Sequence, residues 1–330
     1  MRTLLTVGIS LSVIIASVFA FSHRESVPLA DSRLPVDNMN ITDLTPSGAG
    51  LLAAGELGHI LLSTDEGKSW QATNIETKRH ALITRMAFKD QQNGLAVGHE
   101  GWILRTEDGG NNWQEVRFDD KNSDPLLDVK LQSNGQWLAI GAFGKMLSSN
   151  DGLTWQVETA PNNTDWHLNG IIGSDNGRML MIGEAGTIFK RQDLNQTWQH
   201  IPEFYTGSFY GGLHLGGSEW LVYGMRGNIY KSRDDGQSWQ KVPFNIPVSL
   251  FNHIRLSDQR ILLVGQGGFM FESSDNGDTF KPLTRTNRGT ITDVEQLQNG
   301  NLVLSSDEGV FLQPLPKQQA SNSKNDGVKS

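Results

Sequence analysis

The sequence predicts an all-β protein, a seven-bladed β-propeller of four-stranded antiparallel blades whose last blade is closed by the N-terminal segment. Two observations lead to this fold class. Short apolar runs alternate with glycine-rich turns, which is typical of short strands in tight hairpins. Aromatic residues also recur every 41 to 43 residues, and four-stranded propeller blades have this period. They are Trp70, Trp113, Trp155, Trp198, Trp239 and Phe280.

A glycine pair with the spacing G-x-x-G sets the register of the repeats. An apolar run precedes each pair and another follows it. We therefore expect an inner strand A, strand B before the pair, strand C after it, and an outer strand D that carries the aromatic residue. Ser306 and Gly309 mark a degenerate seventh copy. The six complete pairs are Gly55/Gly58, Gly98/Gly101, Gly141/Gly144, Gly183/Gly186, Gly224/Gly227 and Gly265/Gly268.

A second motif, S-x-D-x-G-x-[ST]-W, lies between strands C and D and is complete at residues 63–70 and 232–239. Its acid can accept hydrogen bonds from the amides of its own turn, and its glycine can adopt a positive φ. In the third copy we expect Ser148 at the serine position of the motif and Asn150 at the aspartate position, so that an amide replaces the acid. Because six copies do the same local work, the motif is interpreted as structural and not catalytic.

The two ends of the chain differ from the repeats. Arg2 precedes an apolar run, and Val18 and Ala20 are small, which predicts a signal peptide over residues 1–20. An uncleaved N-terminal anchor is the alternative, since the run approaches the length of a membrane span. We expect the propeller over residues 27–316 and a disordered polar tail over 317–330. The seventh repeat lacks its aromatic strand D, which the segment around residues 27–36 could supply.

Composition narrows the compartment and the partners. The formal net charge is -8 and the Lys and Arg residues are scattered, which disfavours a nucleic-acid partner. The chain has no cysteine, so it has neither a disulfide nor a lipid-modified cysteine. Export without disulfides is compatible with a bacterial periplasm. We expect a periplasmic monomer, either free or associated with the membrane.

Together these motifs form the Asp-box, or BNR, repeat. Over about residues 30–315 the chain resembles the photosystem II stability/assembly-factor-like family of β-propellers. The resemblance implies an accessory factor that holds membrane-protein assembly intermediates without a cofactor or catalysis. Photosynthetic members carry an arginine patch, whereas the arginines here are dispersed, so that site is not transferred. Sialidases share the repeat, but their arginine and tyrosine constellation is not matched here.

Antiparallel order places the B–C turns and the irregular D–A loops on one face of the ring, and variable loops on a rigid frame usually carry function. We expect a protein partner there, at the mouth of the central channel, with apolar anchors for affinity and charges for specificity. Near the inner end of strand A, a further ring is expected from Asp43, Arg85, Asp128, Gly170, Gly211, His253 and Asp293. The predicted partner-binding residues are Arg85, His99, Glu100, Phe143, Trp166, His167, Glu184, Tyr205, Phe209, Tyr210, Arg226, Phe251 and His253.

No catalytic residues, metal ligands or cofactor are predicted. The histidines lack the close spacing of a zinc site. Acidic side chains of the same face could provide the two carboxylates of a glycosidase, about 5 to 10 Å apart. The favoured function is a non-enzymatic scaffold that binds a protein partner, as an assembly or accessory factor for a membrane-protein complex or an exporter. The alternative is an Asp-box glycoside hydrolase or a carbohydrate-binding propeller.

Overall fold

The computed structural model describes residues 36–173, 177–283 and 289–315, which belong to the unit formed by residues 36–330. The statements below concern these residues. The predicted signal peptide and the predicted C-terminal tail lie outside them, and so does the predicted closing strand except for Val36.

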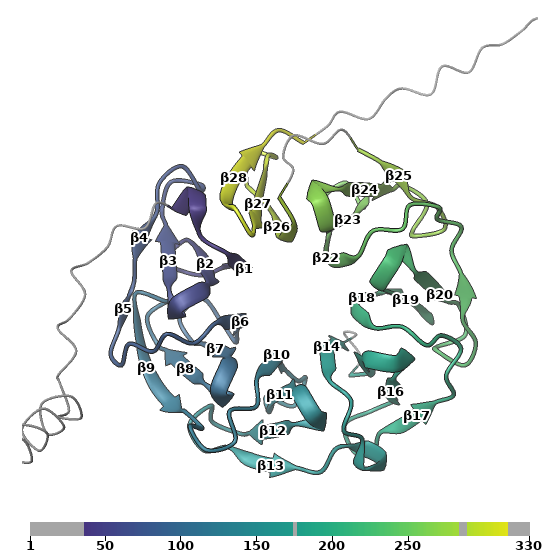
Figure 1. The fold of residues 1–330 in the computed structure, drawn as a ribbon, viewed down its shortest axis with the longest axis horizontal. Helices are drawn as coiled ribbons and strands as arrows, with labels where there is room; N and C mark the ends of the chain where they lie inside the picture. The colour runs from purple at the N-terminus through teal and green to yellow at the C-terminus, as the bar shows by residue number, and fades with distance from the viewer. Residues whose placement is uncertain (1–35, 174–176, 284–288, 316–330) are drawn as a thin grey trace, which may run out of the picture. The chain divides into compact units, whose positions relative to one another are not determined.

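Seven antiparallel sheets surround a central axis, which confirms the predicted seven-bladed propeller (Figure 1). Blade 1 contains β1 (Ile41–Pro46), β2 (Leu51–Gly55), β3 (Ile60–Ser63) and β4 (Gln71–Ala72). Blade 2 contains β6 (Ile83–Phe88), β7 (Gly94–Gly98), β8 (Ile103–Thr106) and β9 (Asn112–Arg117). Blade 3 contains β10 (Leu126–Leu131), β11 (Trp137–Gly141), β12 (Met146–Ser149) and β13 (Gln156–Glu158).

The remaining blades follow the same order. Blade 4 contains β14 (Leu168–Gly173), β15 (Met179–Gly183), β16 (Ile188–Arg191) and β17 (Gln199–Ile201). Blade 5 contains β18 (Phe209–Gly216), β19 (Glu219–Gly224), β20 (Ile229–Ser232) and β21 (Gln240–Lys241). Blade 6 contains β22 (Leu250–Arg255), β23 (Ile261–Gly265), β24 (Met270–Ser273) and β25 (Lys281–Pro282). Blade 7 contains β26 (Ile291–Gln296), β27 (Leu302–Ser306) and β28 (Gly309–Gln313).

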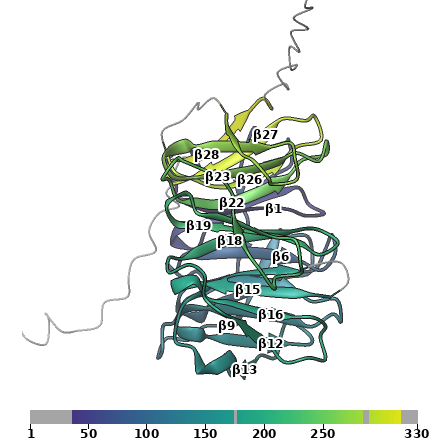
Figure 2. The ribbon, with the colours of Figure 1, turned by 90° about the vertical axis from the view of Figure 1, so that its right-hand side faces the viewer.

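The first strand of every blade lies innermost. Each of these strands contacts the first strands of the two neighbouring blades, from β1 through β26 and back to β1. Strand B is buried along its whole length in six blades and from Trp220 onward in blade 5, and its aliphatic side chains pack between adjacent sheets. Seen from the side, the sheets of successive blades lie face to face (Figure 2). The core is therefore a set of similar layers between blades and not one central cluster.

The glycine pair shapes the B–C turn, a short 3-10 turn in six blades: η2 (Glu56–Gly58), η3 (His99–Gly101), η4 (Ala142–Gly144), η6 (Glu184–Gly186), η7 (Met225–Gly227) and η8 (Gln266–Gly268). Blade 3 shows why both glycines are needed. A Cβ on Gly141 would lie 2.0 Å from the carbonyl oxygen of Pro125, so strand A comes too close for a side chain. Gly144 has a φ of 66°, which favours glycine.

The Asp-box turns have the predicted internal hydrogen bonds. In blade 5, Asp234 Oδ1 accepts from the Ser238 amide at 2.8 Å, and Asp234 Oδ2 accepts from the Ser238 hydroxyl at 2.6 Å. These bonds are the main reason that the pKa of Asp234 is lowered to about 2. The carboxylate thus accepts amide hydrogen bonds for which the tight turn supplies no carbonyl acceptor.

The prediction for the third Asp-box is wrong by one residue. Asp151, not Asn150, accepts the Thr154 amide at 2.8 Å and the Ser149 hydroxyl at 3.0 Å. The turn is one residue shorter than its counterparts, so aligning it on Gly152 shifts the acid by one position. The acid is therefore kept in this copy, and no amide replaces it.

Blade 2 has one strand more than predicted. The short strand β5 (Asn74–Ile75), from the connection after blade 1, pairs in parallel with β9. The Asn74 amide donates to the Asn111 carbonyl at 2.9 Å, and the Glu76 amide donates to the Trp113 carbonyl at 3.0 Å. This pairing covers the outer edge of blade 2, which is otherwise open for pairing with another chain.

Blade 7 has three strands among the described residues, so the predicted fourth strand around residues 27–36 stays a prediction. The ring nevertheless closes at its inner strands, because β1 contacts β26 and β27. The turn η1 (Val36–Asn38) also packs against β28. Met39, Ile41 and Val303 then share one buried cluster that joins blade 7 to blade 1.

The shifted Asp-box can be tested by two neighbouring substitutions. Asp151→Ala removes the acceptor of the turn amides, so we expect it to lower the urea midpoint of unfolding. Asn150→Ala, the matched control, removes a side-chain contact to Gln136 only and should change the midpoint less. Urea titrations followed by tryptophan fluorescence measure both. Equal effects, or a larger effect of Asn150→Ala, would contradict the assignment.

Candidate partner-binding face and inner polar ring

The B–C turns and the D–A loops lie on one face of the ring, as predicted, and this face is called the turn face. Backbone hydrogen bonds join the two kinds of loop there. The Asp119 amide donates to the Glu100 carbonyl at 2.8 Å, and the Gly144 amide donates to the Trp166 carbonyl at 3.0 Å. The turn face is thus a connected surface built by consecutive blades.

Seven residues at one register position of strand A form the inner polar ring. Each pairs with the residue before the first glycine of its blade, or with Ser305 in blade 7, and in each blade a register shift precedes it. The predicted ring is confirmed in six blades, but in blade 6 the position belongs to Asn252 and not to His253. The ring consists of Asp43, Arg85, Asp128, Gly170, Gly211, Asn252 and Asp293.

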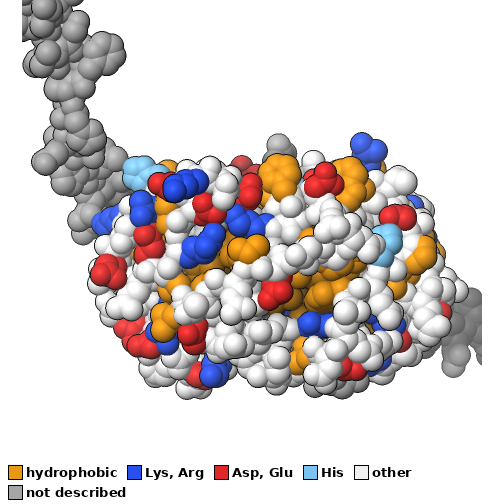
Figure 3. All heavy atoms as spheres, turned by 90° about the horizontal axis from the view of Figure 1, so that it is seen from below, with side chains coloured by type: hydrophobic (Ala, Val, Ile, Leu, Met, Phe, Trp, Pro, Cys, Tyr) orange, Lys and Arg blue, Asp and Glu red, His pale blue; other side chains and the backbone are white. Residues whose placement is uncertain are grey.

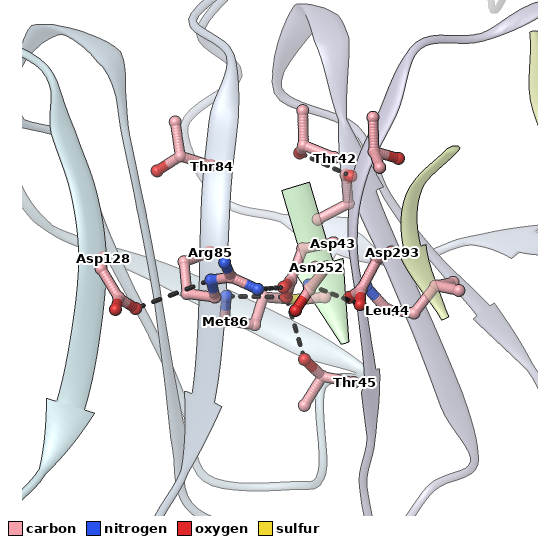
Figure 4. Close-up of polar contacts among 12 residues, drawn as sticks. Thr42, Asp43, Leu44, Thr45, Thr84, Arg85, Met86, Asp128, Asn252 and Asp293 are labelled. Carbon is pink, nitrogen blue, oxygen red and sulfur yellow. Dashed lines mark hydrogen bonds and ion pairs between the residues drawn. The ribbon is translucent and has the colours of Figure 1, made fainter. Parts of the chain in front are cut away.

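At three of the seven junctions a ring carboxylate joins its blade to the next one, and Figure 4 shows Asp43 and Asp293 in this role. Asp43 Oδ2 accepts the Met86 amide of blade 2 at 2.9 Å. Asp128 Oδ2 accepts the Ile171 amide of blade 4 at 2.7 Å. Asp293 Oδ2 accepts the Leu44 amide of blade 1 at 2.8 Å, so the closing contact of the ring uses the same bond as the others.

A second belt of hydrogen bonds lies one residue earlier in strand A. The Thr42 hydroxyl donates to the Ile83 carbonyl at 2.5 Å, and the Thr84 hydroxyl donates to the Leu126 carbonyl at 2.8 Å. The Asn169 side-chain amide donates to the Phe209 carbonyl, and the Thr292 hydroxyl donates to the Ile41 carbonyl. Inner strands of adjacent blades do not pair as a sheet, so these side chains satisfy backbone groups that would otherwise be unpaired.

Arg85 is part of this framework. Its guanidinium contacts Asp43 Oδ1 at 2.9 Å and lies 3.6 Å from Asp128 Oδ1. Burial opposes the Arg85 charge, but the neighbouring carboxylates hold its pKa above its usual range. Burial raises the pKa of Asp43, against the effect of Arg85. Burial and the charge of Asp43 raise the pKa of Asp293 further. Arg85 thus joins blades, and because its side chain is still 29% exposed, its contact with a partner stays a prediction.

Between blades 5 and 6 the hydrogen-bonding pattern changes. A Cβ on Gly211 would lie 2.2 Å from the Tyr223 hydroxyl oxygen, so this tyrosine fills the place of a ring side chain. Its hydroxyl lies 2.6 Å from His253 Nδ1. Burial, helped by nearby lysine and arginine charges, lowers the pKa of His253 to about 4. The Tyr223 hydroxyl and the imidazole thus share one hydrogen bond across this junction, and His253 is a structural residue between blades.

Two predicted apolar anchors lie on the inner strands of blades 5 and 6, which are neighbours around the axis. Tyr210 and Phe251 occupy the position that Thr42 and Thr84 hold in other blades, and their rings lie 5.3 Å apart. Both are half-buried. Burial raises the pKa of Tyr210, and the charge of Glu184 raises it further. The structure thus brings Tyr210 against Phe251, and η6, which contains Glu184, contacts β18, which contains Tyr210.

Four predicted residues meet where blades 3 and 4 adjoin on the turn face. Phe143, at the tip of η4, is 64% exposed, and its ring lies edge-on to His167 at 4.9 Å. His167 Nδ1 lies 3.6 Å from Glu184 Oε1. Trp166 precedes His167 and is 50% exposed. These side chains come from three separate segments, and no sequence spacing brings them together.

The other predicted site residues are placed less consistently. Phe209 is fully buried between blades 4 and 5 and is a core residue, which corrects its prediction as an anchor. Tyr205 packs beneath its own loop, and its hydroxyl donates to the Met225 carbonyl at 3.2 Å. His99 and Glu100 lie in η3 and are half-buried, whereas Arg226 in η7 is exposed. These last three residues lie in the B–C turns of blades 2 and 5, outside the cluster of blades 3 and 4.

Among the described residues, neither the distribution of charged side chains nor the grouping of possible metal ligands identifies another site. On one edge of the ring, Lys and Arg lie among Asp and Glu, with hydrophobic side chains between them (Figure 3). Within the described part of the chain, no group of three His, Asp or Glu side chains is placed to hold a metal ion. None of the described helices is both long and apolar enough to cross a membrane.

The family comparison agrees with the architecture. The family model described as Photosynthesis system II assembly factor YCF48 matches residues 73–214. The predicted resemblance to this family is confirmed. The match covers blade 2 to blade 4 and the beginning of blade 5, which includes the cluster of Phe143, Trp166, His167 and Glu184. No curated protein matches the sequence.

Solved structures share the fold at low sequence identity. A structure of YCF48 bound to D1 peptide is 18% identical, with a TM-score of 0.69, and the alignment covers 88% of this chain and 100% of that chain. YCF48 from Cyanidioschyzon merolae is 14% identical, with a TM-score of 0.68 over 87% and 98% of the two chains. A streptogramin B lyase is 11% identical, with a TM-score of 0.71 over 86% and 96%. The shared fold thus includes an enzyme and by itself decides no activity.

The ring carboxylates should be necessary for stability. Asp293→Ala leaves the buried Leu44 amide and the Asn252 side chain without their acceptor, so we expect a loss of about 2 to 4 kcal/mol in the free energy of unfolding. Asp293→Asn, which keeps one acceptor oxygen, should lose less. Chemical denaturation at constant pH measures both. A variant Asp293→Ala as stable as the wild type would contradict the role of this bond.

Glu295, next to the ring, should make stability depend on pH. Burial and the charge of Asp43 raise its pKa from 4.5 to about 7. A raised pKa means that the folded protein binds the proton more tightly than the unfolded chain does. Stability should therefore fall as the pH rises from about 4.5 to about 7, by up to about 3 kcal/mol from this group.

The variant Glu295→Gln removes this titration. Unfolding free energies of wild type and variant, measured from pH 4 to pH 8, should differ increasingly in favour of the variant as the pH rises. The comparison isolates Glu295 from the other acids, which both proteins share. Parallel curves would show that Glu295 titrates in the folded protein as it does in the unfolded chain.

Proposed function

We propose that this protein is a non-enzymatic propeller scaffold that binds a protein partner through its turn face. Its role would be that of an assembly or accessory factor for a membrane-protein complex or an exporter. The observation that carries the proposal is a division of labour among repeat positions. The glycine pairs and the Asp-box turns that build the blades recur from repeat to repeat, whereas the tips of the B–C turns vary.

Six B–C turns share one backbone conformation but present unlike side chains. The residue at each tip has a φ between 51° and 66°, a conformation in which glycine is least strained. Only blade 6 uses glycine there. The tip residues are Leu57, Glu100, Phe143, Ala185, Arg226 and Gly267. Because the fold does not require these side chains, their variety is available for recognition.

The family match supports a protein partner. The matching family is described as an assembly factor, and a solved structure shows YCF48 bound to D1 peptide. Those statements concern the relatives. Carried to this chain, they favour a propeller that holds a segment of another protein, and they do not identify the complex.

The glycosidase alternative is weakened because several of the carboxylates that it would need have a structural role. Asp43, Asp128 and Asp293, three carboxylates considered for a glycosidase, each accept a backbone amide of the next blade. A general acid or nucleophile must instead face its substrate. No observation favours carbohydrate binding over protein binding.

Export to the periplasm is part of the proposal. It is supported by the apolar run and the small residues near Ala20, and by the absence of cysteine. An exported factor would meet membrane proteins on the outer side of the inner membrane. The same leading segment, if uncleaved, would hold the propeller at that membrane.

Affinity capture tests the proposed function. The full chain, tagged at its C-terminus and expressed in its own host, should retrieve a membrane protein after mild crosslinking and detergent extraction. A second exported protein with the same tag serves as the control. Mass spectrometry of the two samples should show enrichment of the same membrane complex in replicate captures. If the propeller retrieves nothing beyond the control, the proposed function is wrong.

A further inference from the structure

The most distinctive surface of the turn face is defined by Phe143, Asp165, Trp166, His167 and Glu184, called here the blade 3–4 patch. Phe143 comes from η4, Glu184 from η6, and the other three from the connection between β13 and β14. The Gly144 amide bonds to the Trp166 carbonyl, and the His167 amide donates to Glu184 Oε2 at 3.2 Å. These bonds hold the three segments in fixed positions.

The aromatic side chains of this patch do little for the fold. Phe143 sits at a φ of 53°, and a left-handed conformation costs a residue with a Cβ about 1 to 2 kcal/mol. Its ring is 64% exposed, so little burial offsets that cost. Trp166 is also half exposed, although buried tryptophan is worth far more to stability. Phe143 and Trp166 lie in two segments that are joined by the bond from the Gly144 amide to the Trp166 carbonyl, and two large exposed aromatic residues on joined segments indicate a contact surface.

The charge of the patch is negative. The Glu184 side chain is about one-third exposed and contacts His167, through the ring at 3.6 Å and through the backbone amide. Asp165 is exposed beside Trp166. Among the five patch residues, two are carboxylates and one is a histidine. The net charge of the whole chain, -8, has the same sign.

Exposed aromatic faces beside a carboxylate suit a cation. A Lys or Arg side chain can lie against an aromatic ring and pair with the carboxylate at the same time. We infer that the blade 3–4 patch binds an extended segment of a partner protein in which Lys or Arg is adjacent to apolar residues. The inference rests on the proposed function and specifies the chemistry of the partner.

Tyr210 and Phe251 extend the patch toward the axis. Glu184 lies in η6, which contacts β18, the strand of Tyr210, and the rings of Tyr210 and Phe251 lie 5.3 Å apart. Glu184 also contacts His167, whose ring meets that of Phe143. A basic residue paired with Glu184 would place its apolar neighbours over Phe143 or over the pair of Tyr210 and Phe251.

A displayed library of random 12-residue peptides provides the probe. Selection against the full chain should enrich peptides that contain Lys or Arg next to apolar residues. For each selected peptide, a synthetic version with the basic residue replaced by Gln should bind about tenfold more weakly in fluorescence anisotropy. Added salt should weaken binding of the basic version more than that of the Gln version.

Two substitutions and one matched control locate the site. Phe143→Gly removes the ring at a backbone position that favours glycine, so the variant should fold as well as the wild type. Glu184→Gln removes the charge. Both should weaken binding of the selected peptides about tenfold. Leu57→Gly changes the same turn position in blade 1, where the side chain is 46% exposed, and should leave binding unchanged.

Thermal melts of all three variants confirm that differences in binding do not reflect unfolding. Peptides without a basic residue, or peptides that bind Phe143→Gly and Glu184→Gln as tightly as the wild type, would overturn the inference and leave the proposed function standing. A library that yields no binder would also overturn it. The proposed function itself fails only by the affinity capture, which does not depend on these substitutions.

Discussion

Hydrogen bonds between innermost strands are the constraint on which the ring depends. Adjacent blades present edges of sheets to each other near the axis, and the backbone amides there have no strand to pair with. A single aspartate solves this at several junctions. Asp128 and Asp293 each accept their own following amide with one oxygen and the amide of the next blade with the other. The closure from blade 7 to blade 1 repeats the same bond.

This solution carries an electrostatic cost. Carboxylates held near the axis lose hydration, and burial raises the pKa of Asp43 and of Asp293 because it disfavours the charged form. Arg85 offsets part of the cost by lying between Asp43 and Asp128. Between blades 5 and 6 the chain uses a neutral pair, Tyr223 and His253, in place of an acid. The cost of burying a ring carboxylate in one blade is therefore offset by residues of neighbouring blades.

The turn face is free of these demands, which explains how one repeat can carry both fold and recognition. Its backbone is fixed by the glycine pairs and by bonds between B–C turns and D–A loops. The tips can change without loss of a blade contact. Phe143 in blade 3 and Leu57 in blade 1 occupy the same turn position, yet only Phe143 lies in a cluster with a tryptophan and a carboxylate. The proposed recognition would thus depend on which loops adjoin, while the inner strands keep the same arrangement.

The sequence by itself determined the number of blades, the strand order, the two faces and the role of the Asp-boxes, because each depends on local spacing. It also held unused signals: from blade 2 to blade 7 the ring residue stands thirteen positions before the residue that ends strand B, a count that selects Asn252. Phe209 matches a position that is aliphatic in the other blades. Only the tertiary structure decided that Arg85 and His253 join blades and that Phe143, Trp166 and Glu184 meet. Such contacts depend on how loops from different repeats fold against each other, and spacing within one repeat contains no information about that.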